Sequence, residues 1–293
     1  MFKQAIKSVL LFPLWTLHKT FEVYEKVLSS IFPQLKGVGR QQFINFMDND
    51  ISHTKHGPIS FQLYTPNRIC NFRHRTFSTK EPELIEWIEE YGGGVFFDIG
   101  ANIGIYSLFY AKAKEGNVYS FEPSVFNLRQ LAKNISINNL SERITIVSNP
   151  LSDSTGIAKF INGSEDEGGA LSSFGVEYGH DGEPIMSEIN YSVLGFSLDD
   201  LFEKNVLKEM PSLIKIDVDG IEHLILRGAS KTLKSEKLKS LLIEVNDDFK
   251  EQAQQVKAIL ESTGFTLKEK RHSEMTDGSE KFGRTYNQIW IRA

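Results

Sequence analysis

A glycine-containing turn that follows an acid is the stretch of this sequence best suited to holding a cofactor. Residues 95–110 read V-F-F-D-I-G-A-N-I-G-I-Y-S-L-F-Y. An apolar run ends at Asp98, Gly100 and Gly104 follow, and a second apolar run of helical length begins at Ile105. This order predicts a buried strand, a tight turn and a helix. The first turn of that helix offers unpaired N–H groups beside a strand-end carboxylate, which together can bind a polar ligand.

The spacing within this turn separates two classes of cofactor. The dinucleotide fingerprint G-x-G-x-x-G needs three glycines to bring the backbone against a pyrophosphate. Here the turn reads D-x-G-x-N-x-G, with Asn102 in place of a middle glycine. An acid at the strand end suits a cationic or hydroxylated ligand, which favours S-adenosylmethionine with its ammonium group. Asn102 also suits a left-handed turn that contacts no ligand.

A second acid stands where the next strand is expected to end. Val118–Phe121 reads V-Y-S-F and is followed by Glu122 and Pro123, roughly twenty residues after Asp98. A carboxylate at this place in a doubly wound fold accepts hydrogen bonds from ribose hydroxyls. A strand-end glutamate is also common in solvated loops, but after this turn the ribose interpretation is the better one.

Three segments together resemble a known family. They read V-F-F-D-I-G-A-N-I-G-I-Y-S, Y-S-F-E-P and I-K-I-D-V-D-G-I-E-H-L-I-L-R-G-A. They are similar to the FkbM family of S-adenosylmethionine-dependent methyltransferases, and the similarity runs from about Phe77 to the C-terminus. Members of that family methylate oxygen on sugars, glycans and polyketide-type hydroxyl compounds. The resemblance implies the reaction type and leaves the acceptor open.

Composition limits the classes of partner and compartment. A chain of 293 residues with 40% hydrophobic content fits an α/β domain with additions. The net charge of −5 gives no reason to expect nucleic acid as a partner. Cys70 is the only cysteine, which excludes an internal disulfide and a cysteine-built zinc site. We therefore expect a reducing, cytoplasmic location.

Residues 1–36 differ in character from the rest. Val9–Trp15 is strongly apolar, and basic residues flank it at Lys3, Lys7, His18 and Lys19. The run is shorter than the about twenty residues that span a membrane, and no small-residue cleavage site follows it. Two interpretations stay open. The segment forms an amphipathic helix on a membrane or partner, with Trp15 at the interface, or it packs on the catalytic domain, which we favour.

Alternating patterns predict the fold class. Apolar runs with strand character are Val95–Phe97, Val118–Phe121, Ile144–Val147, Leu213–Ile216 and Leu241–Val245, with helical patterns between them. This alternation predicts an α/β fold with a doubly wound, mostly parallel, Rossmann-like sheet. Two last strands, Phe265–Lys268 and Gln288–Ile291, are expected to form an antiparallel hairpin at the sheet edge. We divide the chain into a helical, then irregular N-terminal extension at 1–80 and a cofactor-binding domain at 81–293.

Within the extension, Ile59–Tyr64 alternates like a half-buried strand. Basic residues gather shortly after it, at Arg68, Arg73, His74 and Arg75. Such a cluster could bind a phosphate or carboxylate of a substrate. A solvated face is the interpretation we favour.

Ligands of such sheets bind at the carboxyl ends of the strands. We predict that the strand ends and the glycine turn bind the cofactor through Asp98, Gly100, Asn102, Gly104, Tyr106, Glu122, Asn149, Ser152 and Asp153. Asp98 would bind the ammonium group directly or through water, and Glu122 would hold the ribose. Residues 162–194 are rich in glycine, serine and acids without periodicity, which predicts a substrate-covering loop. Its expected contacts are Ser172, Ser173, Tyr178 and His180.

The segment I-K-I-D-V-D-G-I-E-H carries the candidates for catalysis. Methyl transfer to oxygen needs the nucleophile in line with the methyl group and a base for the hydroxyl proton. Asp217, Glu222 and His223 are near enough to the strand end to be that base. His223 has the most suitable ordinary pKa, although it could also be a solvent-facing helix residue.

A metal-assisted reaction is a further possibility. Asp217, Glu244 and Asn246 follow two strand ends and would supply three oxygen ligands to a cation such as Mg²⁺. A bound cation would lower the pKa of the acceptor hydroxyl. The arrangement is similar to the metal site of catechol-type O-methyltransferases. Alternatively, these acids only hold the cofactor's amino acid end and the loop backbone.

The sequence therefore predicts an S-adenosylmethionine-dependent O-methyltransferase that acts on a saccharide, glycan or similar polar metabolite. Two alternatives stay open. One is a nicotinamide-dependent oxidoreductase, which Asn102 and the missing third glycine argue against. The other is a non-catalytic binding module attached to a membrane through residues 1–36.

Overall fold

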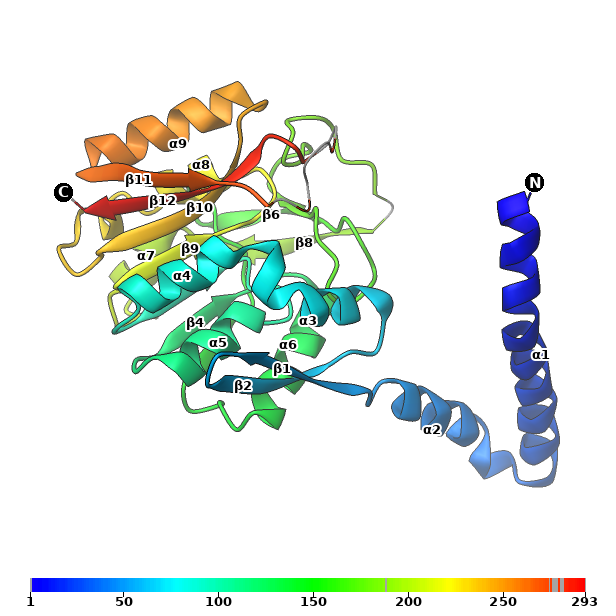
Figure 1. Cartoon of the computed structure of the whole chain (residues 1–293). Helices are drawn as coiled ribbons and strands as arrows, with labels where there is room; N and C mark the ends of the chain where they lie inside the picture. Colours follow the sequence, from blue (N-terminus) through cyan, green and yellow to red (C-terminus); the bar gives the residue numbers. More distant parts are fainter. Residues whose placement is uncertain (1, 188, 274, 276–278, 280–281, 293) are drawn as a thin grey trace. The chain divides into compact units, whose positions relative to one another are not determined.

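The computed structural model describes residues 2–187, 189–273, 275, 279 and 282–292, with side chains described from Phe12 onward. The chain divides into two compact units, Met1–Asp50 and Ile51–Ala293. Figure 1 colours both units along the sequence.

The first unit is helical, as the N-terminal pattern predicts. It consists of α1 (Phe2–Ile31), a short 3₁₀ helix (Pro33–Leu35) and α2 (Val38–Met47). The Glu25 carboxylate accepts hydrogen bonds from the backbone N–H groups of Gly37 (3.2 Å) and Arg40 (3.0 Å), and so closes the start of α2 against α1. Among the described residues, no helix combines the length and the apolar character that crossing a bilayer requires.

The second unit is built on a seven-stranded sheet with the order β11-β12-β10-β9-β3-β4-β5. The strands are β3 (Phe96–Ile99), β4 (Val118–Phe121), β5 (Ile144–Val147), β9 (Leu213–Ile216), β10 (Ser240–Asn246), β11 (Phe265–Arg271) and β12 (Thr285–Arg292). Strands β5, β4, β3, β9 and β10 are parallel, while β12 runs antiparallel to both β10 and β11. The predicted α/β class and the C-terminal antiparallel pair are confirmed.

Helices cover both faces of this sheet (Figure 1). Helices α4 (Pro82–Tyr91), α5 (Ile105–Ala113) and α6 (Val125–Ile137) pack on the face that includes Phe96. Helices α7 (Leu198–Glu203), α8 (Glu222–Arg227) and α9 (Lys250–Ser262) pack on the face that includes Phe97. Successive side chains of a strand point to opposite faces. A strand buried on both faces therefore reads as a continuous apolar run, which is why these strands are recognisable in the sequence.

The boundary between the units lies at residue 50, whereas the sequence pattern placed it at residue 80. Strands β1 (Ile51–His56) and β2 (Ile59–Tyr64) pair as a hairpin, and α3 (Arg68–Lys80) follows. Phe61, Leu63 and Phe77 are buried in the same cluster as the side chains of α4 and α5. Polar residues outnumber apolar ones in β1 and α3. The sequence pattern therefore does not indicate that these two elements belong to the second unit.

Residues 156–195 also contain structure that the sequence pattern does not reveal. Strands β6 (Gly156–Ile161), β7 (Ser173–Phe174) and β8 (Asn190–Gly195) form a small antiparallel sheet. The C-terminal end of the predicted loop at 162–194 is therefore a strand. Only part of that segment is available to cover a site.

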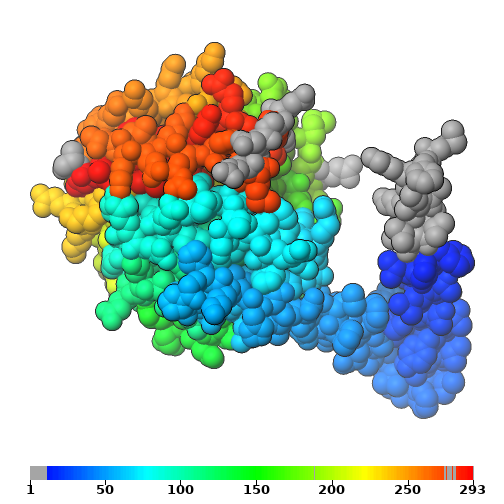
Figure 2. Space-filling view, in the orientation of Figure 1, coloured from blue at the N-terminus to red at the C-terminus, as the bar shows by residue number. Residues whose placement is uncertain are grey.

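Figure 2 shows one face of the second unit, where the segment from α3 to α4 (cyan) meets β11 (orange). The Lys268 ammonium lies 2.6 Å from the Glu90 carboxylate, and Arg271 pairs with Glu86. These ion pairs are exposed, so they contribute little to the stability of the fold. The apolar cluster beneath them holds the layers together.

Asn134 offers a test of how β2 is held to the core. Its buried amide accepts a hydrogen bond from the Tyr64 N–H and donates one to the Ile103 carbonyl, both at 2.9 Å. Asn134→Ala would leave both backbone groups unsatisfied, so we expect a loss of about 2–4 kcal/mol in the free energy of unfolding. Urea denaturation measures this loss. The exposed Ser136 on the same helix provides the control, since Ser136→Ala should change stability by less than about 0.5 kcal/mol. Equal effects of the two substitutions would contradict this role of Asn134.

Candidate active site

A pocket opens where β3, β4 and β9 end, at the edge of the sheet predicted to bind ligands. Its empty space is about 1110 Å³, a volume that includes the open mouth. Its walls come from α3 and the residue that joins it to α4, the turn after β3, the ends of β4 and β9, and the segment before and including β7. Residues that are far apart in the sequence therefore form one cavity.

The glycine turn is shaped by its close contact with the end of β9. Gly100 has φ +79°, and a Cβ atom there would lie 1.8 Å from the Asp217 carbonyl oxygen. Gly104 has φ +85°, and a Cβ atom there would lie 2.4 Å from the Leu131 side chain. Asn102 has φ 53°. Its side-chain amide also donates to the Gly169 carbonyl at 2.6 Å. Asn102 is therefore a left-handed turn residue that also lines the pocket.

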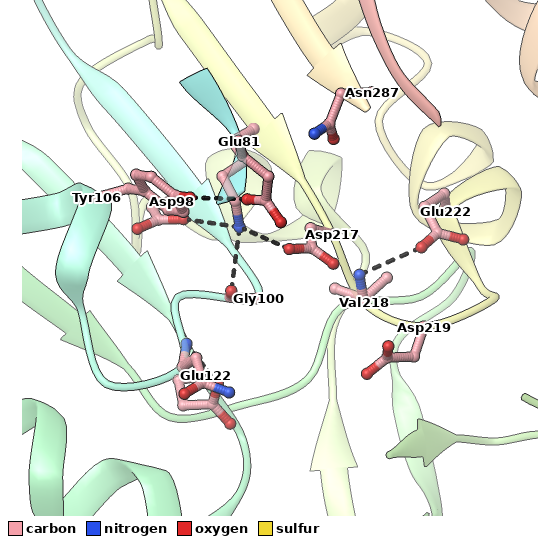
Figure 3. A network of polar contacts seen from close by, with 12 residues as sticks. Glu81, Asp98, Gly100, Tyr106, Glu122, Asp217, Val218, Asp219, Glu222 and Asn287 are labelled. Atoms are coloured by element: carbon pink, nitrogen blue, oxygen red, sulfur yellow. Dashed lines mark hydrogen bonds and ion pairs between the residues drawn. The ribbon is translucent and has the colours of Figure 1, made fainter. Parts of the chain in front are cut away.

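A buried lysine joins the turn to the two central strands. The Lys215 ammonium lies 3.2 Å from the Asp98 carboxylate and 3.5 Å from the Asp217 carboxylate, and it donates to the Gly100 carbonyl at 3.1 Å. Figure 3 shows Asp98, Gly100 and Asp217 around this centre. Burial alone would lower the pKa of Lys215, but the two carboxylates raise it above its ordinary value. Lys215 is therefore a permanent cation in the wall of the pocket.

This arrangement changes the expected role of Asp98. Its side chain is fully buried, accepts a hydrogen bond from the Ser107 hydroxyl at 2.6 Å and does not line the pocket. The carboxylate therefore neutralises Lys215 rather than facing a ligand directly. The sequence places a lysine in an otherwise apolar strand (L-I-K-I), and that pattern is the signal for such a partner.

Glu122 lies in the pocket wall, as its place after β4 predicts. Its two carboxylate oxygens accept hydrogen bonds from the N–H groups of Asn102 and Ser124, both at 2.8 Å. Burial raises the pKa of Glu122 to about 7, against the hydrogen bonds that lower it. The carboxyl group therefore fixes the turn and still faces the cavity.

Three carboxyl groups converge beside the pocket. Oxygen atoms of Asp217, Asp219 and Glu244 lie within 4.8 Å of one another. Burial, with the Asp217 charge, raises the pKa of Asp219 to about 6 and the pKa of Glu244 well above its ordinary value. Asn246, which the sequence grouped with Asp217 and Glu244, donates its amide to the His180 carbonyl at 3.2 Å, and its side-chain oxygen accepts from the Asp248 N–H at 3.0 Å. Asp219 is a member of the cluster that the sequence analysis did not include.

The junction of α3 and α4 supplies charged groups that the sequence pattern did not single out. Lys80 pairs with Glu81, and the Tyr106 hydroxyl donates to Glu81 at 2.7 Å. Glu81 is buried, but the Lys80 charge lowers its pKa to about 2. All three line the pocket. The helix α3 was not predicted, so neither was the approach of its end to the site.

One member of the basic cluster in α3 also reaches the pocket. Arg73 lines it, and its Nε donates to the Gly168 carbonyl at 2.8 Å. By contrast, His74 Nδ1 is hydrogen-bonded to Thr54, and Arg75 is exposed.

The predicted covering segment reaches the pocket at its N-terminal part. Gly169 is held by the side chains of Asn102 and Asn127, and the Leu171 N–H donates to Asp219 at 2.6 Å. Ser172 and Ser173 line the cavity. Tyr178 and His180 do not, since their rings pack against Phe249 and Phe282 respectively.

Two predicted catalytic residues lie away from the cavity. Glu222 is buried and accepts a hydrogen bond from the Val218 N–H at 3.2 Å (Figure 3). It also accepts from the Gly220 N–H at 3.2 Å and from the Gln252 amide. It therefore shapes the turn that carries Asp219. His223 is buried against the edge of Phe249, and its burial lowers its pKa. Neither residue lines the pocket.

The other predicted site residues also fall into two groups, those that line the pocket and those that do not. The pocket is lined by Gly100, Asn102, Tyr106, Glu122, Asn149 and Asp217. It is not lined by Gly104, Ser152, Asp153, Glu244 or Asn246. The Ser152 backbone is instead bonded to Phe196, and Asp153 is exposed. Leu151 lines the cavity where these two were expected.

Comparisons with known proteins address the family. Residues 98–267, more than half of the chain, match a family model described as the methyltransferase FkbM domain. The search of curated proteins returns no match. Among solved structures, the FkbM methyltransferase of Methylobacillus flagellatus KT is similar, with 18% identity, a TM-score of 0.44 and 67% of this chain covered. This chain spans 42% of that protein. The Methanococcus jannaschii fibrillarin pre-rRNA processing protein has 15% identity and a TM-score of 0.45, with 83% of each chain covered.

The buried carboxyl of Glu222 predicts a pH dependence of stability. Burial raises its pKa to about 8 from an ordinary 4.5, so the folded protein holds a proton there that the unfolded chain releases. The stability that this group contributes is complete below about pH 4.5 and is lost as the pH rises through about 8. Between these values, Glu222→Gln should remove a decline of roughly 1 kcal/mol per pH unit.

Denaturation of both proteins from pH 5 to pH 8 measures that slope. A glutamine at position 222 can keep a hydrogen bond to Gln252, because the Gln252 amide oxygen has no partner in the described structure and can accept from the new amide. The exposed Glu251 on α9 is the control, and Glu251→Gln should leave the slope unchanged. Identical slopes for wild type and Glu222→Gln would show that this carboxyl is ionised throughout.

Proposed function

This chain belongs to the FkbM methyltransferase family, and from that premise we propose that it transfers a methyl group to a hydroxyl of a saccharide, glycan or similar polar metabolite. Its domain is that of an S-adenosylmethionine-dependent methyltransferase. The proposal of a hydroxyl-rich acceptor rests on the polar wall of the pocket. Arg73, Lys80, Glu81, Asp217 and Asp219 all line it, and such groups hydrogen-bond hydroxyl-rich molecules. Family membership also argues against the nicotinamide-dependent and non-catalytic alternatives.

The residues of the pocket fit S-adenosylmethionine. The cavity is large enough for a cofactor of this size, and its apolar side chains Phe121 and Leu151 suit an adenine ring. In this proposal Glu122 accepts hydrogen bonds from the ribose. The turn from Gly100 to Asn102, with Tyr106, borders the methionine end. The bound cofactor supplies an electrophilic methyl group.

We assign the general base to Asp217. Its side chain is 31% exposed and lines the pocket, while Lys215 holds one of its oxygens in place. Burial and the Asp217 charge raise the pKa values of Asp219 and Glu244, whereas Asp217 is the member of the three-carboxyl cluster that pairs with the Lys215 ammonium. It can therefore take the proton of an acceptor hydroxyl. Glu222 and His223 are poorer candidates because they do not reach the pocket.

The reaction we propose needs no divalent cation. Three converging carboxyl groups require compensating positive charge or protons. The Lys215 ammonium lies 3.5 Å from Asp217, and the charge of Lys80 acts on both Asp217 and Glu244. The two lysines, and a proton on Glu244 that its raised pKa favours, together supply this compensation without Mg²⁺.

Titration of the protein with S-adenosylhomocysteine tests the cofactor assignment. We expect micromolar binding in the calorimeter, no binding of NAD, and no change on addition of Mg²⁺. Glu122→Ala should weaken binding by roughly ten- to a hundred-fold, since a hydrogen bond to a charged group contributes about 1.5–3 kcal/mol. The exposed Glu142 is the control, and Glu142→Ala should bind like wild type. An unchanged dissociation constant in Glu122→Ala would refute the ribose assignment.

A methyl-transfer assay with glycan acceptors tests the base. Asp217→Asn should lower kcat by roughly 10²–10⁴-fold, because a positioned base contributes that much, while binding of S-adenosylhomocysteine stays close to wild type. The exposed Asp248 lies after β10 and outside the pocket, so Asp248→Asn should keep full activity. Activity should also survive removal of divalent cations by a chelator. Loss of activity on chelation would restore the metal-assisted mechanism, and full activity of Asp217→Asn would exclude this aspartate as base.

A further inference from the structure

The first unit carries an apolar surface but has no core to bury it. From Phe12 to Asp50, none of the described side chains is buried. Large side chains in α1 are more than half exposed, among them Phe12 (63%), Leu14 (60%), Trp15 (57%) and Leu17 (54%). Leaving such a side chain in water instead of burying it forgoes about 1.5–3 kcal/mol. A partner that covers this surface would therefore gain free energy from burying it.

The apolar residues of α1 are spaced to form one face. They recur at alternating steps of four and three along the helix, at Leu10, Leu14, Leu17, Phe21, Tyr24, Leu28 and Ile31. That spacing keeps them on one side of a helix. The return helix α2 covers only part of this face, where the Phe21 and Phe43 rings lie 5.5 Å apart. Leu14, Leu17, Tyr24 and Ile31 stay exposed.

The charge on the same unit selects the kind of partner. The first unit contains six Lys or Arg, all within residues 1–40, and four acids, of which Asp48 and Asp50 lie at its end; in the whole chain acids outnumber bases by 38 to 33. No acid occurs before Glu22. Glu22 is paired with Lys19 at 2.8 Å, and Glu25 is turned to the backbone of α2. The helix therefore combines an apolar face with a net positive charge in its sequence.

We propose that α1 binds flat on an anionic membrane surface. The apolar face would enter the boundary between headgroups and acyl chains, with Trp15 at the interface and the lysines near anionic lipid. Each lysine near such a surface contributes about 1 kcal/mol. A second copy of the chain is a poorer occupant, because it would bring the acid-free stretch 1–21 against like charge. This inference does not depend on the proposed methyl transfer.

Sedimentation of the full chain with lipid vesicles tests the proposal. The vesicles are phosphatidylcholine alone, or phosphatidylcholine with roughly a third of phosphatidylserine. We expect binding to the anionic vesicles that is roughly tenfold or more stronger than to neutral ones, and weaker at high salt. The triple variant Lys3→Gln, Lys7→Gln, Lys19→Gln keeps the apolar face, so it should bind both kinds of vesicle equally weakly.

A matched pair of variants tests the face itself. Leu17→Asp places a charge on it and should abolish binding, whereas Ser30→Asp adds the same charge at an exposed residue outside that spacing and should bind within about twofold of wild type. Circular dichroism and binding of S-adenosylhomocysteine should match wild type in every variant, which separates loss of lipid binding from misfolding.

Three outcomes would overturn the proposal. The first is a chain that stays in the supernatant with both kinds of vesicle, and the second is equal binding of the wild type to both. The third is a dimer in analytical ultracentrifugation that Leu17→Asp dissociates, which would assign the face to a second copy. Failure of any of these tests would leave the cofactor titration unaffected, so the two proposals can fail separately.

Discussion

The ion pairs of Lys215 are the interaction on which the site depends. An isolated charge in a protein interior costs several kcal/mol, and removing one partner of a buried pair typically costs 3–5 kcal/mol. Asp98 at the end of β3 neutralises this lysine from beneath, and Asp217 at the end of β9 meets it beside the pocket. The same ammonium holds the Gly100 carbonyl. One buried cation therefore sets the positions of both strand ends and of the turn between them.

Backbone contacts, together with these ion pairs, fix the turns around the pocket. The turn at Gly100 packs directly on the end of β9, where any side chain would collide with the Asp217 carbonyl. Glu122 and Glu222 each use a buried carboxyl to bind backbone N–H groups, at the turn after β3 and at the turn after β9 respectively. Buried polar groups must be paired. In this protein the pairing shapes the walls of the pocket as well as its chemistry.

The two units differ in how much apolar side-chain surface they bury. The second unit buries two apolar clusters on opposite faces of its sheet and encloses the pocket. The first unit buries none of its described side chains beyond residue 11 and combines apolar with cationic groups. A segment of this kind buries little apolar area of its own. The catalytic chemistry and the proposed attachment to lipid are therefore separate properties of the chain.

The sequence by itself determined the class of fold and the place of the site. Apolar runs such as Val118–Phe121 and Leu213–Ile216, and glycines at 100 and 104, are local signals that depend on neighbouring residues alone. The tertiary structure decided which side chains face the cavity. Asp98 and Glu222 turn inward to a lysine and to backbone N–H groups, while Lys80 and Glu81 reach the pocket from a helix junction with no local signature. Side-chain direction at strand and helix ends is set by packing between segments distant in sequence, and a pattern of neighbours cannot carry that information.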